Sequence, residues 1–426
     1  MSCSASNVRS TFHLHVGAGR LGIGLMMPAI IRSGVSFAVL QRPSKPWNLL
    51  NDVQGVTFYV NGEAICENLT VVRSLKTLPS SDSGTMPPWP NLFVLSYEPL
   101  LLNTLVSTAT SFSISLGSAM LDVIIPLLSS LPRGGNRPTL YAAENNLSMV
   151  AELAKALEDC VEVVPCMVDR ICVDRIIAEN RVDVTCEEYE GEIVVTRQAE
   201  NGLLAPFEGE LVRRPVSDAQ SNYFCRRKNL LVNGMHTTLA FMTLCVNQKK
   251  GGNSEYQEYC EMGDYRLIIW DPSACGSKTY QEIWIWAVAR LAMLLWEHEL
   301  LCNMSILLHA HGTKSNEQLV DDLLDYAVRI LTRLSSISDT TSRVLNGGTG
   351  SRWETRLNTV NRFLLHFRPT PITSLLLQKA NVKLSHMQKV VETLCLQSHR
   401  FTLGPHHHIH HKNHINKHFQ SPLILR

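Results

Sequence analysis

The sequence has almost no net charge, because its 39 Lys and Arg balance its 38 Asp and Glu and leave a formal charge of +1. A chain so close to neutral exerts no long-range attraction on nucleic acid or on anionic lipid. Nucleic acid is therefore not an expected partner. The balance favours a small molecule that is recognised locally.

The cysteines and the apolar runs exclude further classes of protein. The 12 cysteines are scattered, and none stands in the CxxC spacing of a zinc site, so reduced thiols are expected. The first residues lack the apolar stretch of a secretory signal, which favours a reducing, cytoplasmic compartment and leaves an organellar address open. The runs at 92–131 and 284–296 are interrupted by polar residues or are too short to cross a bilayer. No membrane partner is expected.

Short apolar runs alternate with helical patterns through the first half of the chain. Six runs are typical of strands, at 12–16, 35–40, 55–60, 93–95, 112–117 and 139–144. This alternation predicts an α/β Rossmann-type domain with a parallel sheet over residues 1–200. Helical periodicity then dominates and predicts a mainly α-helical substrate and catalytic domain over 201–400. Residues 401–426 hold 7 of the 16 histidines, which predicts a His-rich tail without a packed core.

A glycine-rich turn follows the first predicted strand. Gly17, Gly19 and Gly22 form a GxGxxG pattern that opens a helix. The first glycine permits the tight turn, the second lets the backbone approach a pyrophosphate, and the third lets helix and strand pack closely. The pattern predicts a dinucleotide site, with a plain glycine-rich turn as the alternative. Pro28 is expected to kink or restart the helix that follows.

The end of the second predicted strand bears on the choice of cofactor. A carboxylate that binds the ribose is expected there, but the sequence is VLQRPSK over 39–45. An arginine accommodates a 2′-phosphate, so Arg42 favours NADP, while NAD stays open. The alternative is that Arg42 belongs to a solvated basic loop.

Lys228, Asn233 and His236 are spaced at i, i+5 and i+8 in a predicted helix. At about 100° per residue they share one face within about 12 Å of axial rise. A buried lysine can take a hydroxyl proton while an amide and an imidazole stabilise the developing alkoxide, without a metal. The alternative is an ordinary solvated helix face.

Six segments in order resemble the polyol-specific long-chain dehydrogenases, and within that family the mannitol-1-phosphate 5-dehydrogenases. They are HVGAGRLGIG (15–24), SISLGSAMLDVIIPLL (113–128), AAENN (142–146), VVPCMVDRI (163–171), DVTCEEYEGEIVV (183–195) and RRKNLLVNGMH (226–236). The resemblance covers roughly residues 12–245. It implies a Rossmann domain joined to a helical domain, with the active site in the cleft between them, a nicotinamide cofactor and no metal.

The resemblance also implies roles for individual residues. Lys228 is the general base, Asn233 and Asn145 hold the substrate oxygen, and His236 bonds a neighbouring hydroxyl. Asp169 supports the site, with a structural salt bridge to a neighbouring arginine as its alternative. The segment 326–357 resembles one that carries substrate-contacting basic residues, and Arg343 fits its first position.

Two functional hypotheses follow from these patterns. The first is an NAD(P)-dependent polyol or polyol-phosphate dehydrogenase that interconverts mannitol 1-phosphate and fructose 6-phosphate, or mannitol and fructose. The alternative is an inactive dinucleotide-binding sensor or interaction protein of the same fold. The family includes monomers and homodimers, so the subunit number stays open.

Overall fold

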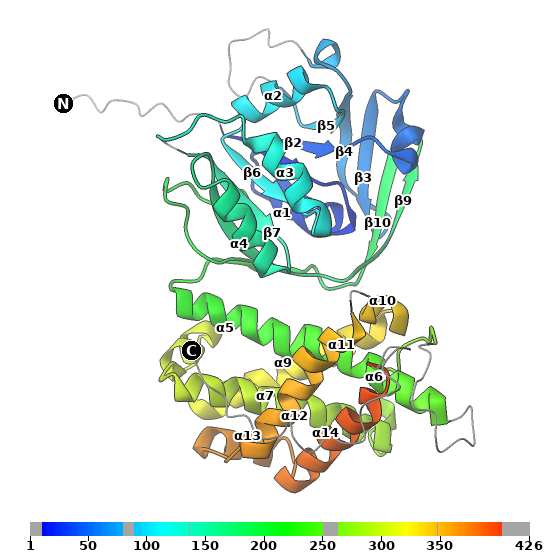
Figure 1. Cartoon of the computed structure of the whole chain (residues 1–426), viewed down its shortest axis with the longest axis vertical. Helices are drawn as coiled ribbons and strands as arrows, with labels where there is room; N and C mark the ends of the chain where they lie inside the picture. The colour runs from blue at the N-terminus through cyan, green and yellow to red at the C-terminus, as the bar shows by residue number, and fades with distance from the viewer. Residues whose placement is uncertain (1–10, 80–88, 136, 250–262, 347, 403–426) are drawn as a thin grey trace, which may run out of the picture. The chain divides into compact units, whose positions relative to one another are not determined.

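The structure is a computed structural model that describes residues 11–79, 89–135, 137–249, 263–346 and 348–402. The predicted His-rich tail falls almost wholly outside these residues. The chain divides into two compact units, Met1–Cys225 and Arg226–Arg426. Figure 1 shows an α/β unit coloured blue to green and a helical unit coloured green to red, which is the predicted fold class. The domain boundary near residue 200 stays a prediction.

The described strands of the first unit form one sheet of 12 strands, in the order β12-β11-β8-β7-β6-β1-β2-β5-β4-β3-β10-β9. Parallel pairing runs without a break from β8 to β4, and antiparallel pairs lie toward both margins. The bounds are β1 Phe12–Val16, β2 Ser36–Gln41, β3 Gly55–Val60, β4 Glu63–Val72, β5 Leu92–Leu95, β6 Ser111–Ile114, β7 Thr139–Ala143, β8 Glu162–Asp169, β9 Cys172–Ala178, β10 Arg181–Cys186, β11 Glu192–Val195 and β12 Val212–Arg213.

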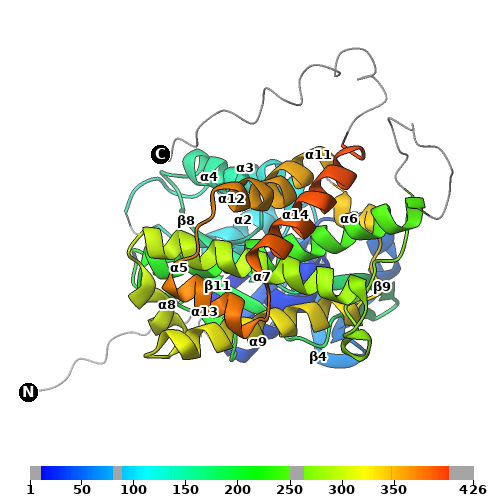
Figure 2. The ribbon, with the colours of Figure 1, turned by 90° about the horizontal axis from the view of Figure 1, so that it is seen from below.

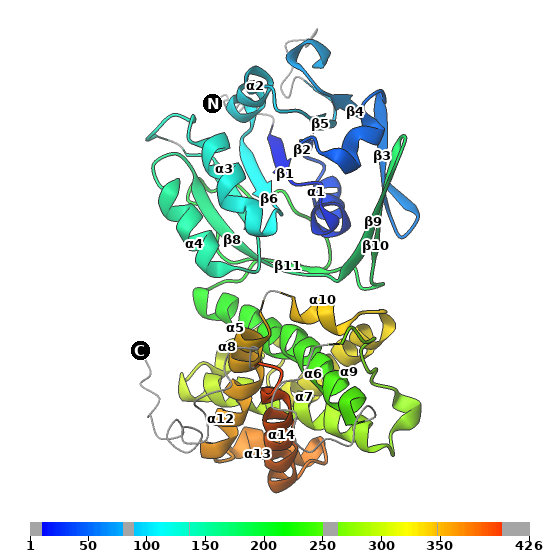
Figure 3. The same cartoon turned by 45° about the vertical axis from the view of Figure 1, so that its right-hand side comes forward.

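Both faces of the central strands β1, β5, β6 and β7 are buried, which is why these strands are almost continuously apolar. Phe12, Leu14 and Val16 of β1 pack on one face with helices α2 (Pro99–Thr108), α3 (Met120–Leu128) and α4 (Leu147–Ala156). The opposite face packs against α1 (Met27–Arg32) and the turn before it. Figure 3 shows the sheet edge at which β3, β9 and β10 lie side by side.

The second unit is helical, as predicted. Its long helix α7 is buried along most of its length among neighbouring helices (Figure 2). The bounds are α5 Asp218–Lys228, which crosses into this unit, α6 Gly234–Lys249, α7 Lys278–Leu300, α8 Met304–His311, α9 Asn316–Ser336, α10 Thr341–Leu345, α11 Thr349–Arg352, α12 Thr359–His366, α13 Pro371–Lys379 and α14 Leu384–His399.

The helical stretch Asp218–Gln248 is the one described helix that is long and apolar enough to cross a membrane by length and composition. Of its most apolar window, 78% is buried inside the protein, as expected for a core helix. Neither apolar run that the sequence analysis singled out meets this test among the described residues.

Candidate functional site

The glycine loop lies where the strand order of the sheet reverses. β1 pairs with β2 on one side and with β6 on the other, so the chain continues to both sides of it. Parallel α/β sheets bind ligands in the crevice at such a point, beyond the carboxyl ends of the strands. The end of β1 is therefore the candidate ligand site of the first unit.

Each glycine of the loop has a distinct steric environment. Gly17 has a φ of +114°, which a residue with a side chain rarely adopts. At Gly22 a Cβ atom would lie 2.1 Å from the carbonyl oxygen of Gly17, so only glycine fits. At Gly19 a Cβ atom would meet nothing nearer than the Ser115 carbonyl oxygen at 3.8 Å. These contacts fit the expected turn and packing roles, and cofactor binding by the three glycines stays a prediction.

Pro28 lies within a continuous helical run, because the π-turn Gly22–Met26 passes directly into α1 without leaving helical dihedral angles. The restart that the sequence analysis offered as one outcome is therefore not seen. Proline lacks an N–H group, and the π-turn lies immediately before it, where the hydrogen-bonding pattern of the helix changes.

A hydrogen-bonded series of buried histidines and serines on β1 and β6 ends at the carbonyl oxygen of Gly17 in the glycine loop. His13 bonds Ser111 through Nδ1 at 2.8 Å and Ser113 through Nε2 at 2.7 Å. His15 bonds Ser113 through Nδ1 at 2.7 Å and the Gly17 carbonyl oxygen through Nε2 at 3.1 Å. Because a carbonyl oxygen only accepts, Nε2 of His15 carries the proton and its Nδ1 accepts from Ser113. Burial lowers the pKa of His15 to about 4, so at neutral pH the ring is uncharged and keeps its proton on Nε2.

The end of β2 is neutral where a ribose-binding carboxylate was expected. Gln41 occupies the last position of the strand, and its Oε1 accepts from the backbone N–H of Ala18 at 3.0 Å. The amide of Gln41 thus bonds the glycine loop and places no negative charge at the end of β2. Arg42 follows directly and is exposed.

Arginines connect the hairpin β9–β10 to the glycine loop. Arg20 donates to the carbonyl oxygen of Val173 at 2.6 Å, and Arg175 donates to that of Ala18 at 2.8 Å. Arg170 also donates to the carbonyl oxygen of Gly24. The hairpin therefore holds the loop and the first turn of its helix in place. The sequence analysis missed this connection because it joins residues far apart in the chain.

The predicted residues Asn145 and Asp169 lie at strand ends of the same unit. Asn145 is exposed just after β7, and Asp169 ends β8 with 4% of its surface exposed. Glu144, the residue before Asn145, was not among the predicted site residues. It accepts from the backbone N–H groups of Leu116 and Gly117, and burial raises its pKa. The roles of Asn145 and Asp169 stay predictions.

In the second unit, the predicted Lys–Asn–His set lies on a helix with a π-turn in its middle. The π-turn spans Asn229–Asn233, between α5 and α6, and Lys228 immediately precedes it with 3% of its surface exposed. In a π-turn the hydrogen bonds join residues five apart, so Asn233 lies one turn above Lys228. In a regular helix Lys228 and Asn233 would lie near the two edges of the predicted shared face, about 140° apart, whereas the wider π-turn reduces the angle between them. Such turns are frequent at functional sites.

His236 is oriented by a buried carboxylate that the sequence analysis missed. Asp339 Oδ2 accepts from His236 Nε2 at 2.9 Å, and Arg343 donates to both oxygens of the same carboxylate. Burial opposes ionisation of Asp339, but the bonds from His236 and Arg343 outweigh it and hold its pKa well below the ordinary value. Asp339 and Arg343 are four residues apart, a spacing that suits an ion pair, but nothing in the sequence connects them to residue 236.

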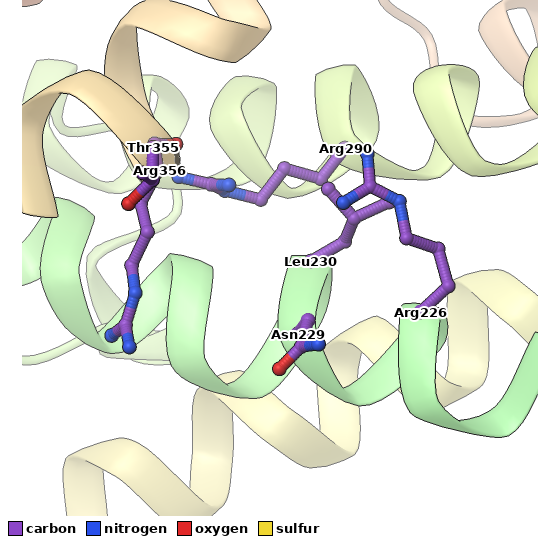
Figure 4. Close-up of a pocket in the computed structure, with 6 residues that line it drawn as sticks. All are labelled: Arg226, Asn229, Leu230, Arg290, Thr355 and Arg356. Carbon is purple, nitrogen blue, oxygen red and sulfur yellow. Dashed lines mark hydrogen bonds between the residues drawn. The ribbon is translucent and has the colours of Figure 1, made fainter. Parts of the chain in front are cut away.

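Arginines also line a small cavity of about 200 Å³ in this unit, drawn in Figure 4. Its walls come from α5, the π-turn, α7 and the second π-turn Trp353–Asn358. The lining residues are Arg226, Asn229, Leu230, Arg290, Thr355 and Arg356. Among the described residues, no group of three His, Cys, Asp or Glu side chains is placed to hold a metal ion. A metal-free mechanism stays a prediction.

No family model and no curated protein matches the chain. Solved structures do match it at low identity. A probable 2-dehydropantoate 2-reductase from Bacillus subtilis is 8% identical with a TM-score of 0.41, over 91% of this chain and 99% of that one. A D-mandelate dehydrogenase solved with NADH is 9% identical with a TM-score of 0.36, over 92% and 100%. A yersinopine dehydrogenase solved with NADP+ is 11% identical with a TM-score of 0.40, over 91% and 99%.

The predicted resemblance to the polyol-specific long-chain dehydrogenases, and to mannitol-1-phosphate 5-dehydrogenase within them, is wrong. No family model or curated protein supports it, and the matching structures are named for other substrates. The assignment as a dehydrogenase of mannitol or mannitol 1-phosphate is corrected with it, and the inactive sensor is not favoured either. The physical reason is that a lysine, an amide and an imidazole on one helix suit proton transfer to any carbonyl oxygen, so the motif does not select a polyol.

Proposed function

We propose that the chain is an NAD(P)-dependent oxidoreductase that interconverts the carbonyl group of a small oxo acid and the matching hydroxy acid. The observation that carries this proposal is the buried Lys228, followed by a π-turn and by an imidazole that a carboxylate orients. These groups can deliver a proton to a carbonyl oxygen and stabilise its developing charge. The first unit supplies a glycine loop with no room for a Cβ atom at Gly22, at the switch point of a parallel sheet.

Each side chain has a defined task in the direction of reduction. Lys228 is the general acid, since its ammonium can donate a proton to the oxygen that becomes the hydroxyl. Asn233 donates a hydrogen bond to the same oxygen. Its amide already donates to the Asn229 Oδ1 at 3.0 Å, which orients it. The nicotinamide supplies the hydride when it is bound.

His236 has its proton on Nε2, because Asp339 accepts there. Its Nδ1 is then the atom that can accept a hydrogen bond from a substrate hydroxyl. Because Asp339 keeps a low pKa, it stays ionised at neutral pH and holds this tautomer. This arrangement positions the imidazole without a metal.

The charge near Lys228 supports an acidic substrate. Arg226, Arg227 and Lys228 occupy the last turn of α5, whose acidic residue, Asp218, is in its first turn. Glu297 pairs with Arg226, and we propose that a substrate carboxylate approaches this cationic turn.

The cofactor is proposed to be NADP in preference to NAD. Gln41 stands where a carboxylate would repel a 2′-phosphate, and the exposed Arg42 follows it. Light scattering of the full chain will decide between a monomer and a homodimer.

The test is a panel of small 2-oxo acids, 2-dehydropantoate among them, with NADH and NADPH, followed by the loss of reduced nicotinamide absorbance. Reduction of at least one oxo acid, and its loss in Lys228→Met, is expected. The matching substrates without the carboxylate serve as controls. Equal turnover of the neutral controls would contradict the acidic substrate class, and activity at wild-type level in Lys228→Met would contradict the mechanism.

A further inference from the structure

The arginine-lined cavity contains more positive charge than its surroundings neutralise. Arg226 pairs with Glu297, with distances of 2.7 Å from Nε to Oε2 and 2.6 Å from Nη2 to Oε1. Arg290 and Arg356 also line the cavity, and neither has a carboxylate partner among the described residues. Three guanidinium groups against one carboxylate leave two positive charges.

Arg290 is the most unusual of the three. Its side chain extends from α7 across the cavity toward Arg356 (Figure 4), and only 1% of its surface is exposed. Nη2 donates to Thr238 Oγ1 at 2.7 Å and to the Arg356 carbonyl oxygen at 2.9 Å, whereas its buried Nε has no partner. Burying an unpaired cation and leaving a donor unsatisfied both destabilise a fold. A feature this costly is expected to serve a ligand.

The packing is built around this side chain. At Gly234 a Cβ atom would lie 2.4 Å from Arg290 Nη1 and 2.7 Å from its Cζ. Glycine at that position lets the guanidinium lie against the helix backbone. Arg356 is fixed by bonds of its Nη1 to the carbonyl oxygen of Asn233 at 3.2 Å and to Thr237 Oγ1 at 2.9 Å. The cationic groups are therefore preorganised rather than loosely exposed.

Burial lowers the pKa of Arg290 to about 9; Cys395 opposes this shift, while Arg356 and Arg226 each lower the pKa by a smaller amount. Burial and Arg352 lower the pKa of Arg356 to about 10. Both shifts arise mainly from burial of the guanidinium groups, a cost that a bound anion would offset.

We propose that this cavity is a binding site for a small dianion, such as a phosphate group or a dicarboxylate. Two uncompensated guanidinium groups match two negative charges, and their planar N–H groups suit the oxygens of phosphate and carboxylate. A volume of about 200 Å³ suits a small anion or one group of a larger ligand rather than a whole cofactor. Asn229 and Leu230 of the π-turn form part of the cavity wall, so an anion bound there would contact the turn that directly follows the proposed acid Lys228.

The test measures anion binding to the full chain by titration calorimetry, with no turnover involved. Inorganic phosphate and malonate are titrated separately, in chloride buffer of matched ionic strength. Saturable binding of either dianion is expected, and the tighter of the two identifies the chemistry of the natural group. In Arg290→Met and Arg356→Gln the dissociation constant should rise at least tenfold. Arg362→Gln is the matched control, because it removes one cation of the same unit whose ion pair with Glu354 lies outside the cavity.

A second measurement, of thermal stability, keeps the proposal testable if one of the cavity variants does not fold. The thermal midpoint of the wild type and of Arg362→Gln should rise with phosphate or malonate concentration, and that of Arg356→Gln should not. The proposal is overturned if neither dianion binds more tightly than chloride, or if binding is equal in the wild type and in both cavity variants. The outcome is independent of the proposed reductase activity, because no substrate or nicotinamide is present.

Discussion

His236 Nε2 donates a hydrogen bond to Asp339 Oδ2 at 2.9 Å, and Arg343 donates to both oxygens of the same carboxylate. The carboxylate is buried, with 1% of its side chain exposed, so the pair is shielded from solvent competition. This relationship links α6 to the segment before α10. It makes residue 339 part of the candidate site, although the sequence pattern contains only the histidine.

Replacing Asp339 by Asn should lower kcat of the proposed reduction by about a hundredfold or more, the range for loss of a positioned acid–base group. The amide can turn its NH2 group toward Nε2 and so favour the other tautomer of His236. Steady-state kinetics on the active oxo acid measures the change. Arg343→Gln keeps the His236–Asp339 bond and should have a smaller effect on kcat. Equal losses in both variants would show that the carboxylate serves the fold alone.

Replacing Lys228 by Met should lower kcat by about a hundredfold to ten-thousandfold, because the proton donor is lost while the apolar stem is kept. Affinity for the dinucleotide, measured by fluorescence titration, should stay within about twofold, the scatter of such substitutions. Lys383→Met, at the exposed start of α14, is the control and should leave both quantities unchanged. A lysine variant that loses dinucleotide binding but keeps kcat would contradict the assigned role.

The fold was predictable because the central strands of the sheet are buried on both faces and are short apolar runs. Strands β1 and β3 lie where the sequence analysis expected them, at Phe12–Val16 and Gly55–Val60. Strands β4 and β9 were missed, since they lie toward the sheet margin and mix polar with apolar residues. Asp339 and Arg290 were missed for another reason. Their hydrogen-bond partners are distant in the sequence, and no local sequence pattern predicts a tertiary contact.

Gly22 and Gly19 should respond differently to alanine. Gly22→Ala places a Cβ atom 2.1 Å from a backbone oxygen, which the loop cannot accommodate, so the free energy of unfolding should fall by about 2 kcal/mol or more. Gly19→Ala meets only an ordinary contact at 3.8 Å and should fold normally. If a pyrophosphate lies against this backbone, Gly19→Ala should still weaken dinucleotide binding about tenfold. Urea unfolding and fluorescence titration measure the two effects, and unchanged binding in Gly19→Ala would contradict the assigned ligand position.

Gln41→Glu should reverse the proposed preference for NADPH. Glutamate keeps an oxygen for the N–H of Ala18 and adds a negative charge where the 2′-phosphate is expected. The ratio of NADPH to NADH affinity should fall about tenfold, the worth of one charged contact. Arg42→Gln should shift the ratio in the same direction without touching the loop. If neither variant changes the ratio, the 2′-phosphate does not bind at this end of β2.

The buried histidines of β1 should make the free energy of unfolding fall in mild acid. Above about pH 6.5 His15 is neutral in both states, so it contributes no pH dependence there. As the pH falls from 6.5, the unfolded chain binds a proton that the folded chain resists until its pKa of about 4. The unfolded state then binds more protons, and stability decreases with falling pH by about 3 kcal/mol for this residue.

His13, whose pKa burial also lowers, should act in the same direction. Urea unfolding between pH 7 and pH 4 measures the dependence. His15→Gln retains a donor for the Gly17 carbonyl oxygen and does not titrate, so its curve should be flatter by about one proton. His386→Gln removes an exposed histidine from α14 and serves as the control. If His15→Gln and the wild type lose stability in parallel, the histidine chain does not cause the acid sensitivity.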